Sequence, residues 1–150
     1  MSGIFGKIIR TAAQTIKEQG GSIPITAAML QLLLEMKPIE GVEQLKVELA
    51  DERLTITGKV KRLIVPIPFT IALKPTRTQG RLLHFEVVQF SPADFETVKK
   101  KVLTQPPLVS YEQGEACFDL NGLDIVKKVP VGSISSVEIK SDKLWVRLGL

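Results

Sequence analysis

The chain has 150 residues, of which 44% are hydrophobic and only 5% aromatic, and its formal net charge is +4. A chain of this length can bury a core of its own, so we expect one domain over residues 1–150. The single cysteine excludes an intramolecular disulfide and a cysteine-based zinc site. No run of about 18 apolar residues occurs, so we expect no membrane-spanning helix.

The first predicted element is an amphipathic helix within residues 1–20. Its apolar stripe consists of Ile4, Phe5, Ile8, Ile9, Ala12, Ala13 and Ile16. Lys7, Arg10 and Lys17 lie on the other side, and two glycines end the pattern. Two burial sites stay open: the stripe packs on the protein's own sheet, or on an anionic membrane surface. We see no signal peptide, so we expect a cytoplasmic protein that can also associate peripherally with a membrane.

A second helix is expected from Thr26, which can serve as its N-cap, to Lys37. Its sequence "AAMLQLLLEM" is apolar almost all round. Such a helix is typically buried on more than one side.

The period of the apolar residues then changes to two, which predicts an antiparallel four-strand meander. Two-residue turns are expected at Asp51-Glu52 and at Lys61-Arg62. The cross-strand pairs that these turns predict are Val47–Ile56, Leu49–Leu54, Ile56–Ile67 and Val60–Leu63. A fourth strand follows, with Leu83, Phe85 and Val87 on the same face. The meander therefore has one continuous apolar face.

Further along the chain, Ser91-Pro92 is a good N-cap and first-turn pair for a helix. That helix should bury Phe95, Val98 and Val102. We expect an extended piece near 116–119 and a short helix around 121–128. A hairpin closes the chain, in which Val137 and Ile139 face Leu144 and Val146 across a turn at Ser141-Asp142.

The strand at 63–73, "LIVPIPFTIAL", carries two prolines, Pro66 and Pro68. Because they are two residues apart, their missing N–H groups fall on the same side of the strand. We expect one neighbouring strand to leave this strand around 66–68 while the opposite edge stays paired. The alternative is an ordinary edge strand that the prolines guard against aggregation.

A curved meander around an apolar helix, closed by "VPVGSISSVEIKSDKLWVRLGL", resembles the tubular lipid-binding (TULIP) superfamily. That superfamily includes the SMP domains, and the layout is most similar to the small bacterial LmeA-like members. The resemblance covers residues 26–150. It implies an α+β fold, in which a curved antiparallel sheet wraps around apolar helices and a groove between helix and sheet holds a lipid.

The residues expected to contact the hydrophobic ligand come from the helix and from the apolar face of the sheet. They are Met29, Leu30, Leu33, Leu34, Val65, Ile67, Phe69, Ile71, Phe85 and Val87. Two alternatives stay open: these residues form a filled core, or the chain is an interaction module that joins copies or partners through its apolar helix and unpaired strand edge.

Basic side chains gather at the two ends of the predicted meander. We expect some of these side chains, and the cations of the first helix, to contact anionic headgroups. The expected contacts are Lys7, Arg10, Lys17, Lys61, Arg62, Arg77 and Arg81. Nucleic acid is not expected as a partner, because one Trp and one Tyr offer no stacking platform.

No catalytic, phosphate-binding or metal-ligating motif occurs, so we expect neither enzymatic activity nor a cofactor. His84 is the only histidine, and its pattern is typical of a structural or surface residue. Cys117, in "EACFDL", is interpreted as a small core hydrophobe.

Overall fold

The computed structural model describes residues 22–35, 38–62, 65–92, 96–105, 108–129 and 132–149. The predicted first helix, with Lys7, Arg10 and Lys17, lies outside these residues, as do Phe95 and the side chain of Arg62.

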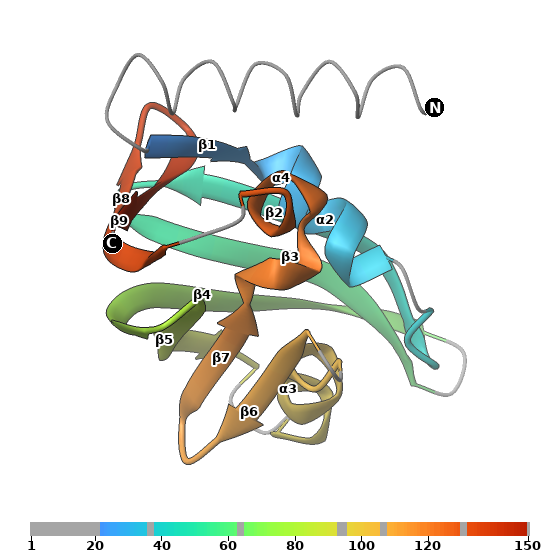
Figure 1. The fold of residues 1–150 in the computed structure, drawn as a ribbon. Coiled ribbons are helices and arrows are strands. Elements are labelled where there is room, and N and C mark those ends of the chain that lie inside the picture. The colour runs from blue at the N-terminus through green and yellow to red at the C-terminus, as the bar shows by residue number, and fades with distance from the viewer. Residues whose placement is uncertain are drawn as a thin grey trace, which may run out of the picture.

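In the described ranges, the larger of two antiparallel sheets has six strands (Figure 1). They are β2 (Val42–Ala50), β3 (Arg53–Arg62), β4 (Val65–Gln79), β5 (Leu82–Ser91), β6 (Val109–Glu112) and β7 (Glu115–Asp119). Their order is β2-β3-β4-β5-β7-β6, so the predicted meander forms one half of the sheet and the β6–β7 hairpin extends it.

The smaller sheet joins segments from far apart in the sequence. Its strands are β1 (Ser22–Thr26), β8 (Ser133–Lys140) and β9 (Lys143–Gly149), in the order β1-β9-β8. The helices are short: α2 (Ala27–Glu35), α3 (Glu96–Leu103), the 3-10 turn η1 (Leu120–Gly122) and α4 (Asp124–Lys127).

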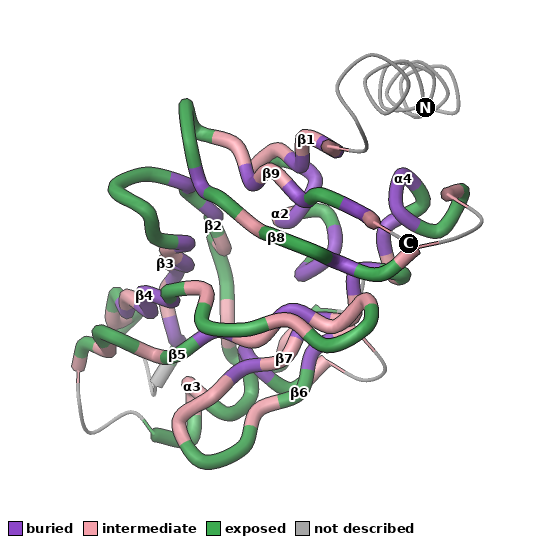
Figure 2. The backbone as a smooth tube through the Cα atoms, turned by 60° about the vertical axis from the view of Figure 1, so that its left-hand side comes forward, coloured by how far each residue is buried: buried purple, intermediate pink, exposed green. Residues whose placement is uncertain are grey.

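Both sheets contribute to one hydrophobic core, which α2, α3 and α4 complete. Figure 2 shows exposed residues at the turns and along much of β8, and buried residues on the other strands and on the helices. The sheets are also tied by their backbones, because the amide of Ile134 on β8 donates to the carbonyl of Gly80, 2.7 Å away, in the β4–β5 turn.

The predicted α+β architecture, a sheet wrapped around apolar helices, is wrong. The protein is mostly β, and a second sheet takes the place that the prediction gave to a helix. Lengths explain the difference, because α2 has nine residues and spans roughly 14 Å, whereas the fifteen residues of β4 span roughly 50 Å. Thr26 does cap α2, since its Oγ1 accepts from the amide of Met29 at 3.2 Å.

The sequence analysis missed strand β1, as it also missed β6. The sequence of β1, "SIPIT", does alternate, and Ile23 and Ile25 are fully buried. The segment is only five residues long and runs directly into α2, so its signal is masked by the stronger helix pattern. Its pairing with β9 turns the predicted C-terminal hairpin into a three-stranded sheet.

The predicted pairs across the first turn and the closing hairpin are confirmed. Val47 pairs with Ile56, and Ile139 pairs with Leu144. Both residues of each turn have positive φ, at Asp51-Glu52 and at Ser141-Asp142, as a type I′ turn requires.

The predicted turn at Lys61-Arg62 is wrong. Val60 pairs with Ile67, and the ladder continues to Arg62 and Val65. The register differs from the prediction by an even number of residues, so the same set of side chains still faces the core.

The strand predicted at 116–119 is confirmed as β7, and the short helix at 121–128 corresponds to η1 and α4. Ser91 does not cap a helix, because it is the last residue of β5 and pairs with Thr70. The following helix, α3, begins at Glu96 and buries Val102 fully and Val98 in part.

The expectation for the two prolines is confirmed. Pro66 and Pro68 stay in register with β3, whereas β5 pairs with β4 only from Thr70 onward. Because a proline cannot donate to a ladder, both backbones face away from β3 toward the open edge, where they present carbonyls but no N–H groups.

Candidate functional site

The structure divides the ten predicted ligand contacts into two groups. Seven are buried in the hydrophobic core, namely Met29, Leu30, Leu33, Leu34, Phe69, Ile71 and Phe85. Ile67 and Val87 are half-buried at its margin, whereas Val65 is 66% exposed. The apolar face therefore continues beyond the core at one place, the end of the sheet where β3 meets β4.

We call this place the hairpin end and define it by Lys59–Lys61 on β3 and Val65–Pro68 on β4. Its four β4 residues are all apolar, and no strand of the described ranges pairs with one edge of β4 there. Pro66 and Pro68 lie beside Lys61 and Lys59 of β3, so cations flank the apolar residues. The hairpin end thus combines an exposed apolar surface with positive charge.

A groove of about 580 Å³ lies between α3 and the turn that follows α2. One wall consists of Pro38, Ile39 and Glu40, and the other consists of Thr97, Lys100, Lys101, Thr104 and Gln105. The turn is fixed to the hairpin end, because the amide of Lys61 donates to the carbonyl of Gly41 at 2.8 Å. The groove and the hairpin end are therefore adjoining parts of one region.

The sequence analysis missed Lys100 and Lys101 as candidate headgroup contacts. They lie on the exposed face of α3, which a helix-period pattern could have identified. Lys99, which precedes them, is different, because its ammonium group lies over the rings of Phe90 and Tyr111. Burial lowers the pKa of Lys99, but its hydrogen bonds with Glu96 and Tyr111 outweigh this and raise the pKa overall.

Two of the predicted anion contacts are engaged within the protein. Arg81 donates to the carbonyls of Val126, Val129 and Gly132 and to the side chain of Asn121, at 2.8–3.1 Å. Arg77 lies 3.0 Å from Glu115. These contacts give Arg81 a structural role, whereas Lys61 is exposed.

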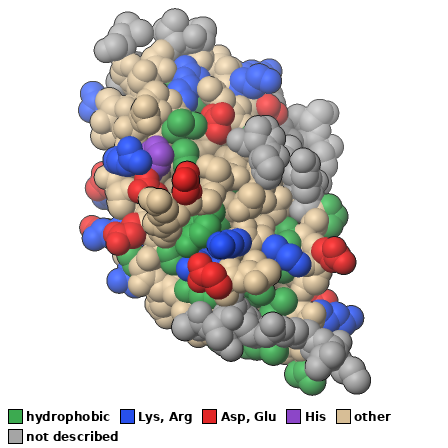
Figure 3. Space-filling model, turned by 90° about the horizontal axis from the view of Figure 1, so that it is seen from below, with side chains coloured by type: hydrophobic (Ala, Val, Ile, Leu, Met, Phe, Trp, Pro, Cys, Tyr) green, Lys and Arg blue, Asp and Glu red, His purple; other side chains and the backbone are tan. Residues whose placement is uncertain are grey.

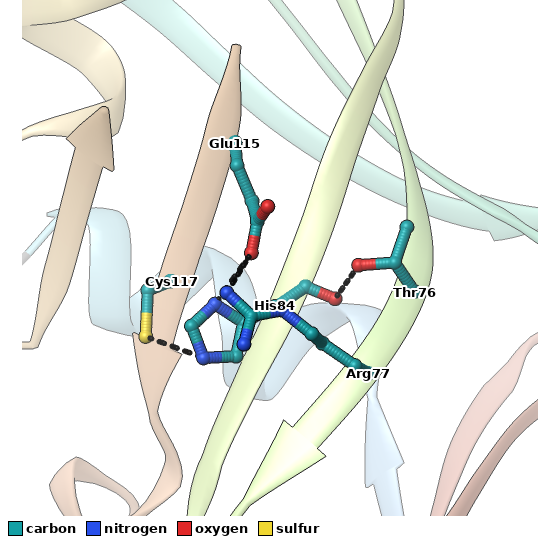
Figure 4. Close-up of polar contacts among 5 residues, drawn as sticks. All are labelled: Thr76, Arg77, His84, Glu115 and Cys117. Atoms are coloured by element: carbon teal, nitrogen blue, oxygen red, sulfur yellow. Dashed lines mark hydrogen bonds and ion pairs between the residues drawn. The ribbon is translucent and has the colours of Figure 1, made fainter. Parts of the chain in front are cut away.

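A second cluster lies on the outer face of the larger sheet, away from the core. Arg77, His84, Cys117 and Ser110 form one row across β4, β5, β7 and β6, because each is in register with the next. Figure 4 shows Arg77, His84, Glu115 and Cys117 together with Thr76, and His84 lies between Glu115 and Cys117. The interpretation of Cys117 as a core residue is wrong, since its neighbours Ala116 and Phe118 are the buried ones.

Each ring nitrogen of His84 has a polar neighbour in this cluster. Nδ1 of His84 lies 2.7 Å from Oε1 of Glu115, and Nε2 lies 3.8 Å from the Sγ of Cys117. Burial raises the pKa of Cys117, and the charges of Asp119 and Glu115 add to this. The thiol therefore holds its proton at neutral pH. Among the described residues, no group of three or more His, Cys, Asp and Glu side chains is arranged to hold a metal ion.

Comparison of the chain with protein-family models, with curated proteins and with solved structures gave no match. The resemblance to the tubular lipid-binding superfamily therefore stays a prediction. None of the helices in the described ranges is long and apolar enough to cross a membrane.

Proposed function

We propose that the protein binds a lipid with an anionic headgroup at the hairpin end and its adjoining groove. The observation that carries this proposal is the exposure of Val65, 66%, at the end of an otherwise buried apolar face. Exposed apolar residues that continue a core face and have charged neighbours are typical of a binding surface. An acyl chain would contact this surface.

Charge supports the choice of an anionic headgroup. Lys100 and Lys101 line the groove, and Lys59 and Lys61 lie on the adjoining strand. Each lysine near an anionic surface contributes about 1 kcal/mol of binding. Glu40 is the acidic residue among those lining the groove, so lysines outnumber acids there.

The unpaired edge of β4 is less suited to the alternative, an interaction module that adds a strand from a partner. Strand addition depends on main-chain hydrogen bonds from both chains. Pro66 and Pro68 supply no donors at this edge. Lipid contact needs none.

Vesicle cosedimentation tests the proposal. The wild-type protein should bind vesicles that contain phosphatidylglycerol more than vesicles of phosphatidylcholine alone. Replacing Lys100 and Lys101 by Glu should weaken binding to the anionic vesicles by at least about 30-fold, because each lysine contributes about 1 kcal/mol and each new carboxylate adds repulsion. Val65→Ser should weaken binding to both vesicle types, because it removes apolar contact area.

The matched control replaces Lys127 and Lys128 by Glu, another pair of adjacent exposed lysines, on and next to α4. Figures 1 and 2 both place α4 away from α3. This control should bind like the wild type. Equal and negligible binding of the wild type to both vesicle types would contradict binding to a lipid within a membrane. Native mass spectrometry of the same sample then distinguishes a protein with one copurified lipid from an assembly of copies.

A further inference from the structure

The cluster around His84 lies on a different face from the lipid region and has a different chemistry. It lines a depression of about 320 Å³ with Arg77, Ser110, Glu112, Gln113, Glu115 and Cys117. In Figure 3 the only histidine is visible at the surface among acidic and basic side chains. The depression is therefore open to a small molecule.

The order of the contacts is that of a nucleophile, a base and a residue that orients the base. An ionised carboxylate can only accept hydrogen bonds, so Glu115 fixes the proton of His84 on Nδ1. Nε2 then carries a lone pair directed at the thiol, 3.8 Å away. Because the imidazole is only 12% exposed, its orientation is held by the neighbouring strands.

We propose that Cys117, His84 and Glu115 form a nucleophilic site that accepts an acyl group from an activated ester or a thioester. In the proposed step, Sγ attacks the carbonyl carbon while Nε2 of His84 takes the thiol proton. The bond from that carbon to its oxygen or sulfur leaving group breaks, and the proton passes to the leaving group. The product is a thioester on Cys117, and no oxidant or reductant is needed.

The charges around the thiol divide into two sets with opposite effects. Glu115 and Asp119 disfavour a negative charge on the sulfur, whereas Arg77 and a hydrogen bond from Ser110 favour it. Because the thiol stays protonated at neutral pH, its reaction there depends on removal of the proton by His84. This dependence makes the proposal testable.

The probe is p-nitrophenyl acetate, and the readouts are release of p-nitrophenolate and an acetyl adduct located by mass spectrometry. Cys117 is the only cysteine, so a thioester adduct can form only there, and mass spectrometry distinguishes it from acetyl groups on histidine, tyrosine or lysine. Cys117→Ala is the blank. At pH 7, His84→Gln should acylate about 100-fold more slowly than the wild type, which is the usual minimum for a positioned general base.

Two further measurements separate this role from a structural one. In His84→Gln the rate should rise only at alkaline pH, where the thiol loses its proton, whereas the wild type should already react at pH 7. Glu115→Gln leaves the imidazole in place but no longer fixes its tautomer, so it should slow acylation by about tenfold while the melting temperature stays close to that of the wild type. The proposal is overturned if the wild type reacts no faster than His84→Gln at pH 7, or if no adduct forms on Cys117.

Discussion

Gly58 leaves room for the ring of Phe69 on the neighbouring strand. A Cβ at this position would lie 2.8 Å from Cζ of that ring and 3.2 Å from the carbonyl oxygen of Glu43. Real Cβ atoms essentially never approach another atom to 2.8 Å, and Phe69 is buried in a packed core where it has little freedom to move. The glycine is therefore required by packing and not by its backbone angles.

Gly58→Ala is accordingly expected to lower the free energy of unfolding by about 1–3 kcal/mol, as overpacking of a core does. Chemical denaturation measures this loss. Gly149→Ala is the control, because its nearest neighbour outside the adjacent residues is Cβ of Ser135 at an ordinary 3.5 Å. Adding Phe69→Leu to Gly58→Ala should cost less than the sum of the single changes. Additive losses would show that the ring is not the obstacle.

At the scale of the elements, alternation in the sequence predicts which side chains face the core better than it predicts where a strand turns. The β3–β4 ladder shows this, because the predicted turn was misplaced and yet Ile56 and Ile71 are both fully buried. Alternation specifies parity alone, and any even displacement preserves it. The positions of Asp51-Glu52 and Ser141-Asp142 were predictable because short polar pairs interrupt the apolar alternation there.

The open edge of β4 yields a prediction of its own. At residues 66 and 68 this edge presents carbonyls only. Replacing Pro66 and Pro68 together by Val adds two N–H groups there, and an edge with both N–H and C=O groups can pair with another chain. The double variant should stay folded, because its pairing with β3 is unchanged, but should self-associate more than the wild type as concentration rises. Size-exclusion chromatography with light scattering measures this.

Pro75→Val is the matched control, because Pro75 lies where β5 already covers that edge, at an irregularity of the β4–β5 pairing. It should leave the association state unchanged. A double variant that matches the wild type at every concentration would show that the prolines do not protect this edge.

At the scale of the whole molecule, Arg81 connects parts of the chain that are distant in sequence. It extends from the β4–β5 turn, and its guanidinium donates to carbonyls in and after α4 and next to β8. Nothing in the sequence distinguishes it from the other arginines, so its predicted role was an anion contact. The structural role of Arg81 depends on contacts between residues that are distant in the sequence. The periodicity of apolar residues does not reveal such contacts.

Arg81→Met keeps most of the aliphatic stem and removes the four hydrogen bonds. It should lower the free energy of unfolding by roughly 1.5–3 kcal/mol or more, since hydrogen bonds from charged groups contribute this much each. Arg77→Met is the comparison, because its ion pair is exposed and such pairs contribute about 0–1 kcal/mol. Thermal and chemical unfolding measure both losses. Equal losses in the two variants would contradict the structural role of Arg81.

The two candidate sites were predictable to different degrees, because only one of them depends on contacts between distant parts of the sequence. Val65 and Ile67 were identified because they belong to the apolar alternation of a single strand. The neighbourhood of His84, Glu115 and Cys117 was not predictable. It depends on the pairing of β5 with β7, which are separated by the 23 residues 92–114 that include α3 and β6, and such pairing is a property of topology.

The pairing of β1 with β9 has a consequence for how the protein is made. On the ribosome, β1 emerges about 120 residues before the strand that it needs, which at about 5–20 residues per second is a delay on the order of 6–25 s. The meander from β2 to β5 can form meanwhile, because its partners are adjacent in the chain. Ile23 and Ile25, both inaccessible in the finished protein, have no partner strand during that interval. The small sheet is therefore the last part to close, and the nascent chain is most vulnerable to wrong association just before it does.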